Sequence, residues 1–253
     1  MLPSTGQTRT VVQQNHAFIA PDGHVWGALP RWSSAQGAIL ISPQMRGKPR
    51  FGQYLIMMGS EGVGAAPAAG VQRFIYVMDG QIVVDVASEQ HTLQAGHFAY
   101  LPPDTPHEVR SDATEARLLI FEKRYEVSSL VPDTRPAAHF GHAWAGEGTP
   151  FMGDEAARLR VLLPTDLAYD MAINLFTFQP GAALPFVETH IMEHGLYLLE
   201  GQGVYRLDEC WYPIHAGDSI WMGPYCPQWF CAIGKTQSTY IYYKDVNRDP
   251  LAE

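Results

Sequence analysis

The residue types best suited to metal chemistry lie in one short segment, Glu188-Thr-His-Ile-Met-Glu-His194. Glu188 and His190 are two positions apart, so on an extended strand their side chains share a face. His194 opens the next run of strand-forming residues, and a short turn before it would bring its imidazole over that face. One carboxylate and two imidazoles form a mixed oxygen and nitrogen donor set, which suits Mn²⁺, Fe²⁺ or Zn²⁺.

A structural role is the simpler alternative for these side chains. Buried histidines on paired strands are commonly hydrogen-bonded core residues, and a glutamine such as Gln228 is commonly a hydrogen-bonded loop residue. Glu193 lies in the same segment but is expected in a solvated turn. We prefer the metal-site interpretation because Glu188 and His190 are in register with His194, and because the segment belongs to an internal repeat.

The chain contains the same unit twice. Tyr76-Val-Met-Asp-Gly-Gln81 is matched by Tyr197-Leu-Leu-Glu-Gly-Gln202 at an offset of 121 residues. The same offset, without a gap, pairs Ala95-Gly96 with Ala216-Gly217, His107 with Gln228, and Lys123 with Lys244. A constant offset over separated landmarks indicates a duplicated unit of roughly 110 residues. We therefore expect two domains, residues 1–137 and residues 138–253.

Each copy has the composition and spacing of β structure. Short runs rich in aromatic and β-branched residues alternate with glycine-containing turns, which predicts an all-β sandwich or barrel. The expected strands of the second copy are 195–199, 204–207, 211–214, 219–222 and 239–243. Residues 154–162 could form one short helix at most. Residues 127–148 are expected to connect the domains, and residues 1–50 to add strands to the first.

The first copy lacks the candidate ligands. At the repeat offset, Glu188, His190 and His194 are replaced by Pro67, Ala69 and Arg73, and only His107 keeps a ligand type. Since one imidazole cannot hold a metal ion, we expect this copy to be metal-free. His107 is then a core or pocket histidine, and Arg73 a structural salt-bridge partner.

Composition narrows the classes of partner. The net charge is −9 and the basic clusters are no longer than pairs, so nucleic acid and anionic membrane are poor partners. Three cysteines without a Cys-x-x-Cys motif make a disulfide framework improbable. No apolar run approaches the length of a membrane span, and no signal peptide is recognised. We expect a cytoplasmic protein.

The motifs of the second copy resemble those of the cupins. Cupins have one motif with two histidines and a glutamate before a glycine turn, and a second with a glycine, a proline-rich turn and a final histidine. In this chain Glu188 and His190 stand at the two histidine positions, His194 at the glutamate position and Gln228 at the final histidine. The resemblance implies a bicupin, with two tandem barrels of the double-stranded β-helix or jelly-roll type.

This exchanged ligand set is similar to that of the ureidoglycine aminohydrolase family. Glu-x-His-x-x-x-His followed 34 residues later by Gln is the pattern of that family. Further matches are His194-Gly195, Glu200-Gly-Gln-Gly-Val-Tyr205, Ala216-Gly-Asp218 and Tyr243-Lys-Asp-Val-Asn-Arg248. The resemblance covers most of the chain and is strongest from about residue 162 to residue 248.

The resemblance also implies roles for individual residues. The implied metal ligands are Glu188, His190, His194 and Gln228. The two oxygen donors and the absence of a thiolate favour Mn²⁺. Tyr240 and Lys244 are implied to contact the substrate, and their equal parity places them on one face of the last strand. Tyr205 is a further substrate-binding candidate. For Lys244 the alternative is a solvated strand-end charge, since Lys123 holds the same place in the first copy.

The implied reaction is hydrolysis of (S)-ureidoglycine to (S)-ureidoglycolate and ammonia, in purine (allantoin) catabolism. A divalent ion with one carboxylate ligand leaves a charge of about +1, which favours a small anionic substrate. Glu188, Tyr240 and Lys244 are the catalytic candidates. Direct displacement of the amine and an imine route both remain open, as does whether Asp170 reaches the site.

Two other classes of protein remain open. An Fe²⁺-dependent cupin dioxygenase ordinarily uses three histidines and a glutamate, so Gln228 argues against it. A non-catalytic small-molecule-binding cupin is disfavoured by Tyr240 and Lys244 beside an open metal. A homo-oligomer is expected, because bicupins often pair through their barrel edges.

Overall fold

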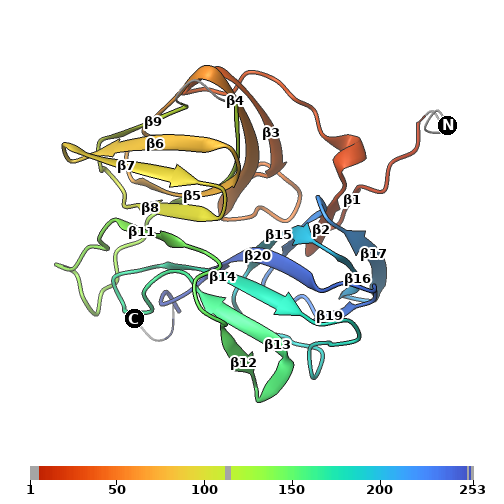
Figure 1. Ribbon diagram of the computed structural model, residues 1–253. Helices are drawn as coiled ribbons and strands as arrows, with labels where there is room; N and C mark the ends of the chain where they lie inside the picture. Colours follow the sequence, from red (N-terminus) through yellow and green to blue (C-terminus); the bar gives the residue numbers. More distant parts are fainter. Residues whose placement is uncertain (1–5, 112–114, 250, 252–253) are drawn as a thin grey trace.

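The computed structural model describes residues 6–111, 115–249 and 251, and in this part of the chain nearly all regular structure is strand. The first elements are β1 (Val11–Val12), β2 (His16–Ile19) and the 3₁₀ turn η1 (Pro21–Gly23). Two curled groups of strands follow, one for each half of the chain (Figure 1). The all-β prediction is confirmed.

The N-terminal half forms one strongly curled, nine-stranded sheet in the order β11-β8-β5-β10-β4-β9-β6-β7, with β3 paired to β4. Its strands are β3 (Trp32–Ile41), β4 (Phe51–Ala65), β5 (Val71–Asp79), β6 (Gln81–Val86), β7 (Glu89–Gln94), β8 (His97–Leu101), β9 (His107–Arg110), β10 (Ala116–Arg124) and β11 (His139–His142). The 15-residue β4 pairs with β3, β9 and β10, and so closes the curl.

The C-terminal half consists of two facing sheets. Its strands are β12 (Thr149–Phe151), β13 (Asp154–Val161), β14 (Met171–Phe178), β15 (His194–Glu200), β16 (Gln202–Leu207), β17 (Cys210–His215), β18 (Ser219–Met222), β19 (Gln228–Ala232) and β20 (Ser238–Asp245). One sheet has the order β1-β2-β18-β15-β20-β14-β13-β12, and the other has the order β17-β16-β19. Their inner faces enclose an apolar core that includes Phe178, Leu198, Phe230 and Tyr240.

The strand positions follow the sequence repeat. At the offset of 121 residues, β6 coincides with β16 and β7 with β17, residue for residue. Gly80 and Gly201 both have positive φ, 76° and 81°, as the tight turns after β5 and β15 require. The five strands predicted for the second copy are all present.

One local expectation is wrong, and a second holds for only part of its segment. Residues 154–161 form strand β13 rather than a helix, because the segment pairs along its length with β14. Residues 1–50 do not add all their strands to the first half. β3 lies there, but β2 pairs with β18 of the second half, where Phe18 enters the apolar core.

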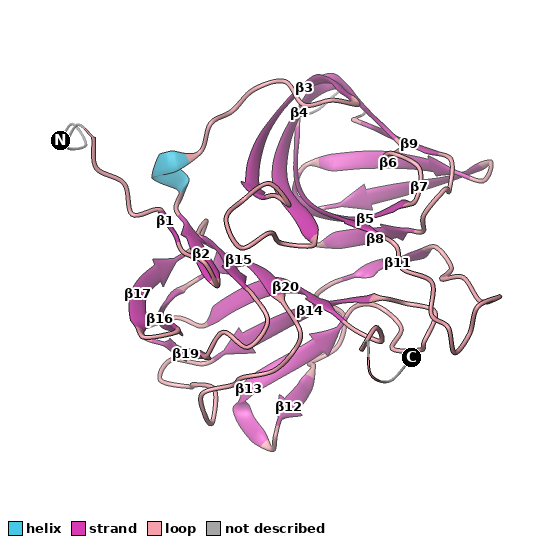
Figure 2. Cartoon of the chain, turned by 180° about the vertical axis from the view of Figure 1, so that it is seen from behind, coloured by secondary structure: helices cyan, strands magenta, loops and turns pink. Residues whose placement is uncertain are grey.

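Terminal strands of each half therefore pair with the sheet of the other half. Figure 2 shows β1 and β2 beside β15 and β17, although they precede the N-terminal barrel in the chain. Conversely, β11 lies beyond residue 137 yet pairs with β8 of the N-terminal sheet. A chain division at residue 137 therefore separates the main body of each barrel but not these terminal strands.

The two barrels pack against each other through their large sheets. A shared apolar cluster joins Phe51, Phe74 and Phe121 of the first half to Ile173 and Tyr243 of the second. Buried apolar contact of this extent makes the halves one continuous body. None of the described helices is long and apolar enough to cross a membrane.

Candidate active site

All seven residues singled out from the sequence line one cavity of about 410 Å³ in the C-terminal barrel. They are Glu188, His190, His194, Tyr205, Gln228, Tyr240 and Lys244. The cavity lies between the two facing sheets, and its apolar walls include Leu184, Leu196 and Phe176. Convergent polar groups in a largely apolar pocket are typical of a binding or catalytic site.

Strand alternation places the residues from β20 and β15. Tyr240, Tyr242 and Lys244 alternate along β20 and all face the cavity. His194 begins β15, as expected from the sequence, and is the register partner of Lys244. The prediction that Tyr240 and Lys244 lie on one face of the last strand is therefore confirmed.

Glu188 and His190 reach the cavity in a different way from the one predicted. They do not share a regular strand, because the chain makes only an isolated bridge at Glu188 and a bend before His194. Glu188 is fixed by backbone hydrogen bonds with Gln228. His190 is held through its carbonyl, which accepts a hydrogen bond from Tyr225 N at 2.7 Å.

The two histidines are close and oriented. Their ring centroids are 4.8 Å apart, and the two ring planes are stacked at an angle of 28°. His190 Nδ1 lies 3.1 Å from the Met192 carbonyl, and the carbonyl can only accept, so Nδ1 carries the proton and Nε2 presents its lone pair. His194 Nε2 is buried and has no hydrogen-bond partner.

Gln228 links the histidines to the tyrosines. Its amide nitrogen donates to His190 Nε2 at 3.0 Å, and its Oε1 accepts from the Tyr205 hydroxyl at 3.3 Å. Tyr205 and Tyr240 are also hydrogen-bonded to each other. A continuous polar chain therefore runs from β20 through Gln228 to His190.

The types of donor atom in the cavity fit a divalent cation, but their present positions do not form a closed ligand set. His194 Nε2, which is buried without a hydrogen-bond partner, and His190 Nε2, whose lone pair accepts from the Gln228 amide, lie at the same cavity as the Glu188 carboxylate. An imidazole whose other nitrogen binds a backbone carbonyl is the usual arrangement of a metal ligand. Among the described residues, however, no three His, Cys, Asp or Glu side chains are arranged to hold an ion as they stand. Ligation by Gln228 Oε1 requires its amide to turn over.

Burial dominates the electrostatics of the cavity. It raises the pKa of Glu188, an effect opposed by the nearby charges of His190 and Lys244. It lowers the pKa of Lys244, which Glu188 and Asp245 in turn raise. The pKa of His194 lies well below its usual value, because the ring is buried and faces His190 and Lys244. The His194 imidazole is therefore neutral near pH 7, and a neutral imidazole can act as a metal ligand.

The tyrosine hydroxyls remain protonated. Burial raises the pKa of Tyr205 and of Tyr240 well above the usual value, and the Glu188 carboxylate raises both further. Both side chains therefore act as neutral hydrogen-bond donors at physiological pH.

Asn174 and Tyr242 also line the cavity, and sequence reasoning missed both of them. They are register partners on β14 and β20, and a side-chain hydrogen bond joins them. Strand parity with Tyr240 and Lys244 was the signal for Tyr242. For Asn174 the sequence carries no comparable signal.

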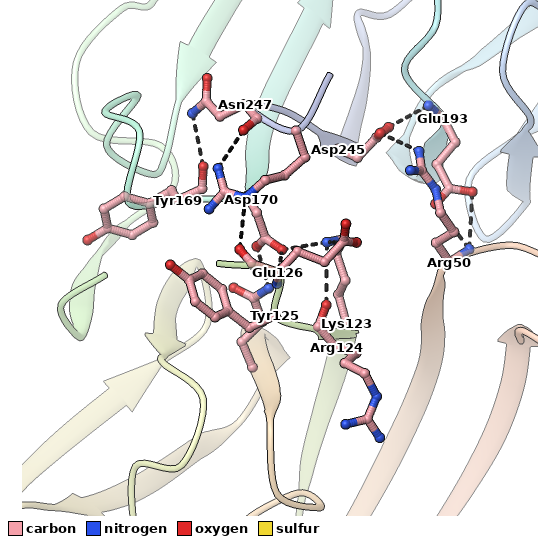
Figure 3. Close-up of polar contacts among 12 residues, drawn as sticks. Arg50, Lys123, Arg124, Tyr125, Glu126, Tyr169, Asp170, Glu193, Asp245 and Asn247 are labelled. Atoms are coloured by element: carbon pink, nitrogen blue, oxygen red, sulfur yellow. Dashed lines mark hydrogen bonds and ion pairs between the residues drawn. The ribbon is translucent and has the colours of Figure 1, made fainter. Parts of the chain in front are cut away.

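Other residues near the motif have structural positions. Glu193 is not a solvated turn residue, because only 1% of it is exposed and it pairs with Arg50. Asp170 does not line the cavity; it is fully buried and pairs with Lys123 of the other barrel (Figure 3). Trp229 of β19 packs against the apolar core, and its Nε1 donates to the Leu184 carbonyl at 2.7 Å.

The equivalent point of the N-terminal barrel is filled by an ion pair. Arg73 is 1% exposed and binds Glu122 at 2.7 Å, so its prediction as a salt-bridge partner is confirmed. Its Nη1 also lies 3.2 Å from His107 Nε2. Burial and the Arg73 charge lower the pKa of His107 to about 4. In this barrel the Arg73 guanidinium thus lies beside His107, where the C-terminal barrel has its candidate metal ligands.

Two curled barrels, with one polar cavity between facing sheets, define a bicupin. A family model described as Cupin domain matches residues 59–122 and residues 174–242. The chain is 44% identical over 249 residues to a probable (S)-ureidoglycine aminohydrolase of Oryza sativa subsp. japonica, covering 97% of this chain and 78% of the relative. It is 32% identical to the (S)-ureidoglycine aminohydrolase of Escherichia coli, covering 95% and 92%. The chain belongs to the (S)-ureidoglycine aminohydrolase family of cupins.

Solved structures agree with this assignment. The crystal structure of protein Ylba from E. coli superposes with a TM-score of 0.83 at 31% identity, covering 96% of each chain. A putative glyoxylate-induced protein from Pseudomonas aeruginosa superposes with a TM-score of 0.88 at 28% identity, covering 98% of this chain and 94% of that one. The tandem-barrel arrangement is therefore common to these proteins over nearly their whole length.

Proposed function

We propose that this chain hydrolyses (S)-ureidoglycine. One water is consumed, the bond between the α-carbon and the amine nitrogen breaks, and a hydroxyl takes the amine's place, giving (S)-ureidoglycolate and ammonia. The observation that carries the proposal is the convergence of Glu188, two histidines, Tyr240 and Lys244 on one cavity, in a chain whose relatives bear this name. The reaction would place the chain in purine catabolism.

We propose Mn²⁺ as the ion of this site. Its ligands would be Glu188, His190, His194 and, with its amide turned over, Gln228. Held by one carboxylate and three neutral donors, a divalent ion would keep a net positive charge, which would favour a small anionic substrate. When bound, the ion supplies Lewis-acid polarisation and a template for the substrate. Two oxygen and two nitrogen donors without a thiolate support manganese over softer metals.

Lys244 would bind the substrate carboxylate. Its ammonium faces the cavity, and the neighbouring Glu188 and Asp245 favour its charged form against the cost of burial. Tyr240 and Tyr205, which stay protonated, would donate hydrogen bonds to the substrate's carbonyl oxygens. Three fixed donors orient the reacting carbon before the carbon–nitrogen bond breaks.

Glu188 would also handle the proton. Burial raises the pKa of its carboxyl group above the usual value, which favours taking a proton from water and returning it to the departing amine. Removing this carboxylate would therefore affect both the ion and the proton transfer.

An ammonia-release assay with fresh ureidoglycine tests the proposal against its alternatives. Purified protein supplied with Mn²⁺ is expected to release ammonia faster than the spontaneous breakdown, without uptake of oxygen. Oxygen uptake with Fe²⁺ would indicate a dioxygenase instead. Saturable binding of ureidoglycine without product would indicate a binding protein.

A further inference from the structure

We propose that Arg50, which belongs to the N-terminal barrel, is a positioning residue for the active site in the C-terminal barrel. The proposal rests on the proposed function for the roles of His194 and Lys244. Arg50 lies immediately before β4, at the end of the loop that follows β3. It is not one of the residues that line the cavity.

Arg50 binds two carboxylates of the other barrel. Its backbone N lies 3.0 Å from Glu193 Oε1 and its Nε 3.2 Å from the same oxygen. Its Nη2 donates to Asp245 Oδ2. Figure 3 shows Arg50 beside the two acidic side chains, Glu193 from the residue directly before β15 and Asp245 from the end of β20.

These two carboxylates flank two residues of the site. Glu193 directly precedes His194, and Asp245 directly follows Lys244. His194 and Lys244 are register partners on β15 and β20 and both face the cavity. Since successive side chains of a strand point to opposite faces, Asp245 lies behind the sheet that carries Lys244 in front. Arg50 therefore holds the strand pair from the face opposite the cavity.

Charge balance makes this contact important. Glu193 is 1% exposed and Asp245 8%, and Glu193 N donates to Asp245 Oδ1 at 2.5 Å. Arg50 forms ion pairs with both of these carboxylates. Without the guanidinium, two buried carboxylates would face each other at the point where β15 and β20 meet. The strand ends would separate, and His194 and Lys244 would move with them.

The neighbouring residues continue the same contact. The ring of Phe51 stacks on Tyr243 with centroids 4.1 Å apart. A Cβ atom at Gly195 would lie 2.2 Å from that Phe51 ring, so only glycine fits beneath it. Arg50 and Phe51 thus lie directly against residues 193, 195, 243 and 245. We infer that this is what the metal-free barrel contributes to catalysis.

The test compares Arg50→Met with Arg46→Met. Arg46 is an exposed arginine of the same loop, and its Nε binds Gln14 at 3.2 Å, away from the site. The first measurement is the imidazole ¹H–¹⁵N spectrum of the metal-free protein, with signals assigned by His190→Gln and His194→Gln. The His194 signals are expected to shift in Arg50→Met and to stay unchanged in Arg46→Met.

The second measurement is the Mn²⁺ dissociation constant. Groups that orient a metal ligand typically change affinity or activity about 10- to 100-fold when removed. We expect a weakening in this range, and a similar fall in kcat/KM, in Arg50→Met only. Adding Glu193→Gln to Arg50→Met removes the facing charge and is expected to recover part of both losses, which is a positive coupling in the double-mutant cycle.

Unchanged His194 signals in a folded Arg50→Met protein would overturn the proposal, and so would an equal loss in Arg46→Met. If Arg50→Met does not fold, Arg50→Lys takes its place. It keeps the charge but reaches one carboxylate, and the same His194 shift is expected. If the wild-type protein releases no ammonia from ureidoglycine, the proposed function fails. The His194 signals still decide the role of Arg50.

Discussion

Glu188 and Gln228 exchange both of their backbone hydrogen bonds, Glu188 N to Gln228 O at 2.9 Å and Gln228 N to Glu188 O at 3.0 Å. They are 40 positions apart in the sequence, and this single bridge makes them neighbours. The first and last of the four proposed ligands are therefore fixed relative to each other by the main chain. Adjustments on metal binding fall to side-chain torsions, above all the amide of Gln228.

Elemental analysis is expected to give one metal ion per chain. Within the described part of the chain, the C-terminal cavity brings Glu188, His190 and His194 together, whereas Arg73 occupies the equivalent point of the first barrel. His190→Ala and His194→Ala are each expected to lower bound metal and to abolish activity, because lost ligands weaken binding and misorient the rest. His107→Gln, the matched control, should leave the metal content unchanged. Two ions per chain would contradict an inert first barrel.

Gln228→His is expected to change the metal preference. An amide oxygen is a harder and weaker donor than imidazole, so the substitution should raise affinity for Zn²⁺ or Fe²⁺ and reduce turnover with Mn²⁺. Competitive metal titration followed by the ammonia assay measures both effects. Unchanged preference and turnover would place Gln228 outside the ligand set, as a hydrogen-bond partner of Tyr205 and His190 only.

Lys244→Met is expected to lower kcat/KM without loss of metal. Methionine keeps most of the stem and removes the charge, so the fold should survive. A hydrogen bond to a charged group contributes about 1.5–3 kcal/mol, which corresponds to roughly a 10- to 150-fold loss. Steady-state kinetics and elemental analysis check the two parts separately. Normal kinetics would show a lysine that only fills the cavity wall, and lost metal would show a structural role.

The sequence could predict much of the site because two of its signals are local. Strand alternation alone puts Tyr240 and Lys244 on one face, and β20 has that geometry. The repeat offset aligns the strands of both barrels and identifies Arg73 as the counterpart of His194. Neither signal needs knowledge of contacts between distant segments.

The errors come from contacts between distant segments. Glu193 looks solvated in the sequence, but its partner Arg50 is 143 residues away. Residues 154–161 contain good helix formers such as Ala157 and Leu159, yet pairing with β14 overrides that propensity. The repeat could have predicted a strand here, since the offset of 121 residues aligns this segment with β3. The pairing of β2 with β18 of the other barrel could not be predicted from the local sequence pattern.

The stability of the fold is expected to fall at acidic pH partly through His107. Its pKa is lowered to about 4 in the folded state, against about 6.5 in an unfolded chain. As the pH falls below 6.5 the unfolded state takes up the proton first, so stability is lost between pH 6.5 and 4. Between pH 7.5 and 5 this amounts to roughly 2 kcal/mol. Urea unfolding at both pH values should show a smaller difference for His107→Gln, and an equal difference would exclude this histidine as a source.

The most direct test of the central claim is the rate of ammonia release from freshly prepared (S)-ureidoglycine by the Mn²⁺-loaded protein, beside Glu188→Gln at the same concentration. Glu188→Gln keeps the shape of the side chain but removes the charge and the proton carrier. The account predicts fast, saturable release of one ammonia per ureidoglycine by the wild-type protein, with (S)-ureidoglycolate as the product, and release no faster than spontaneous breakdown by the variant. Equal rates for the two proteins, or a wild-type rate equal to spontaneous breakdown, would contradict it.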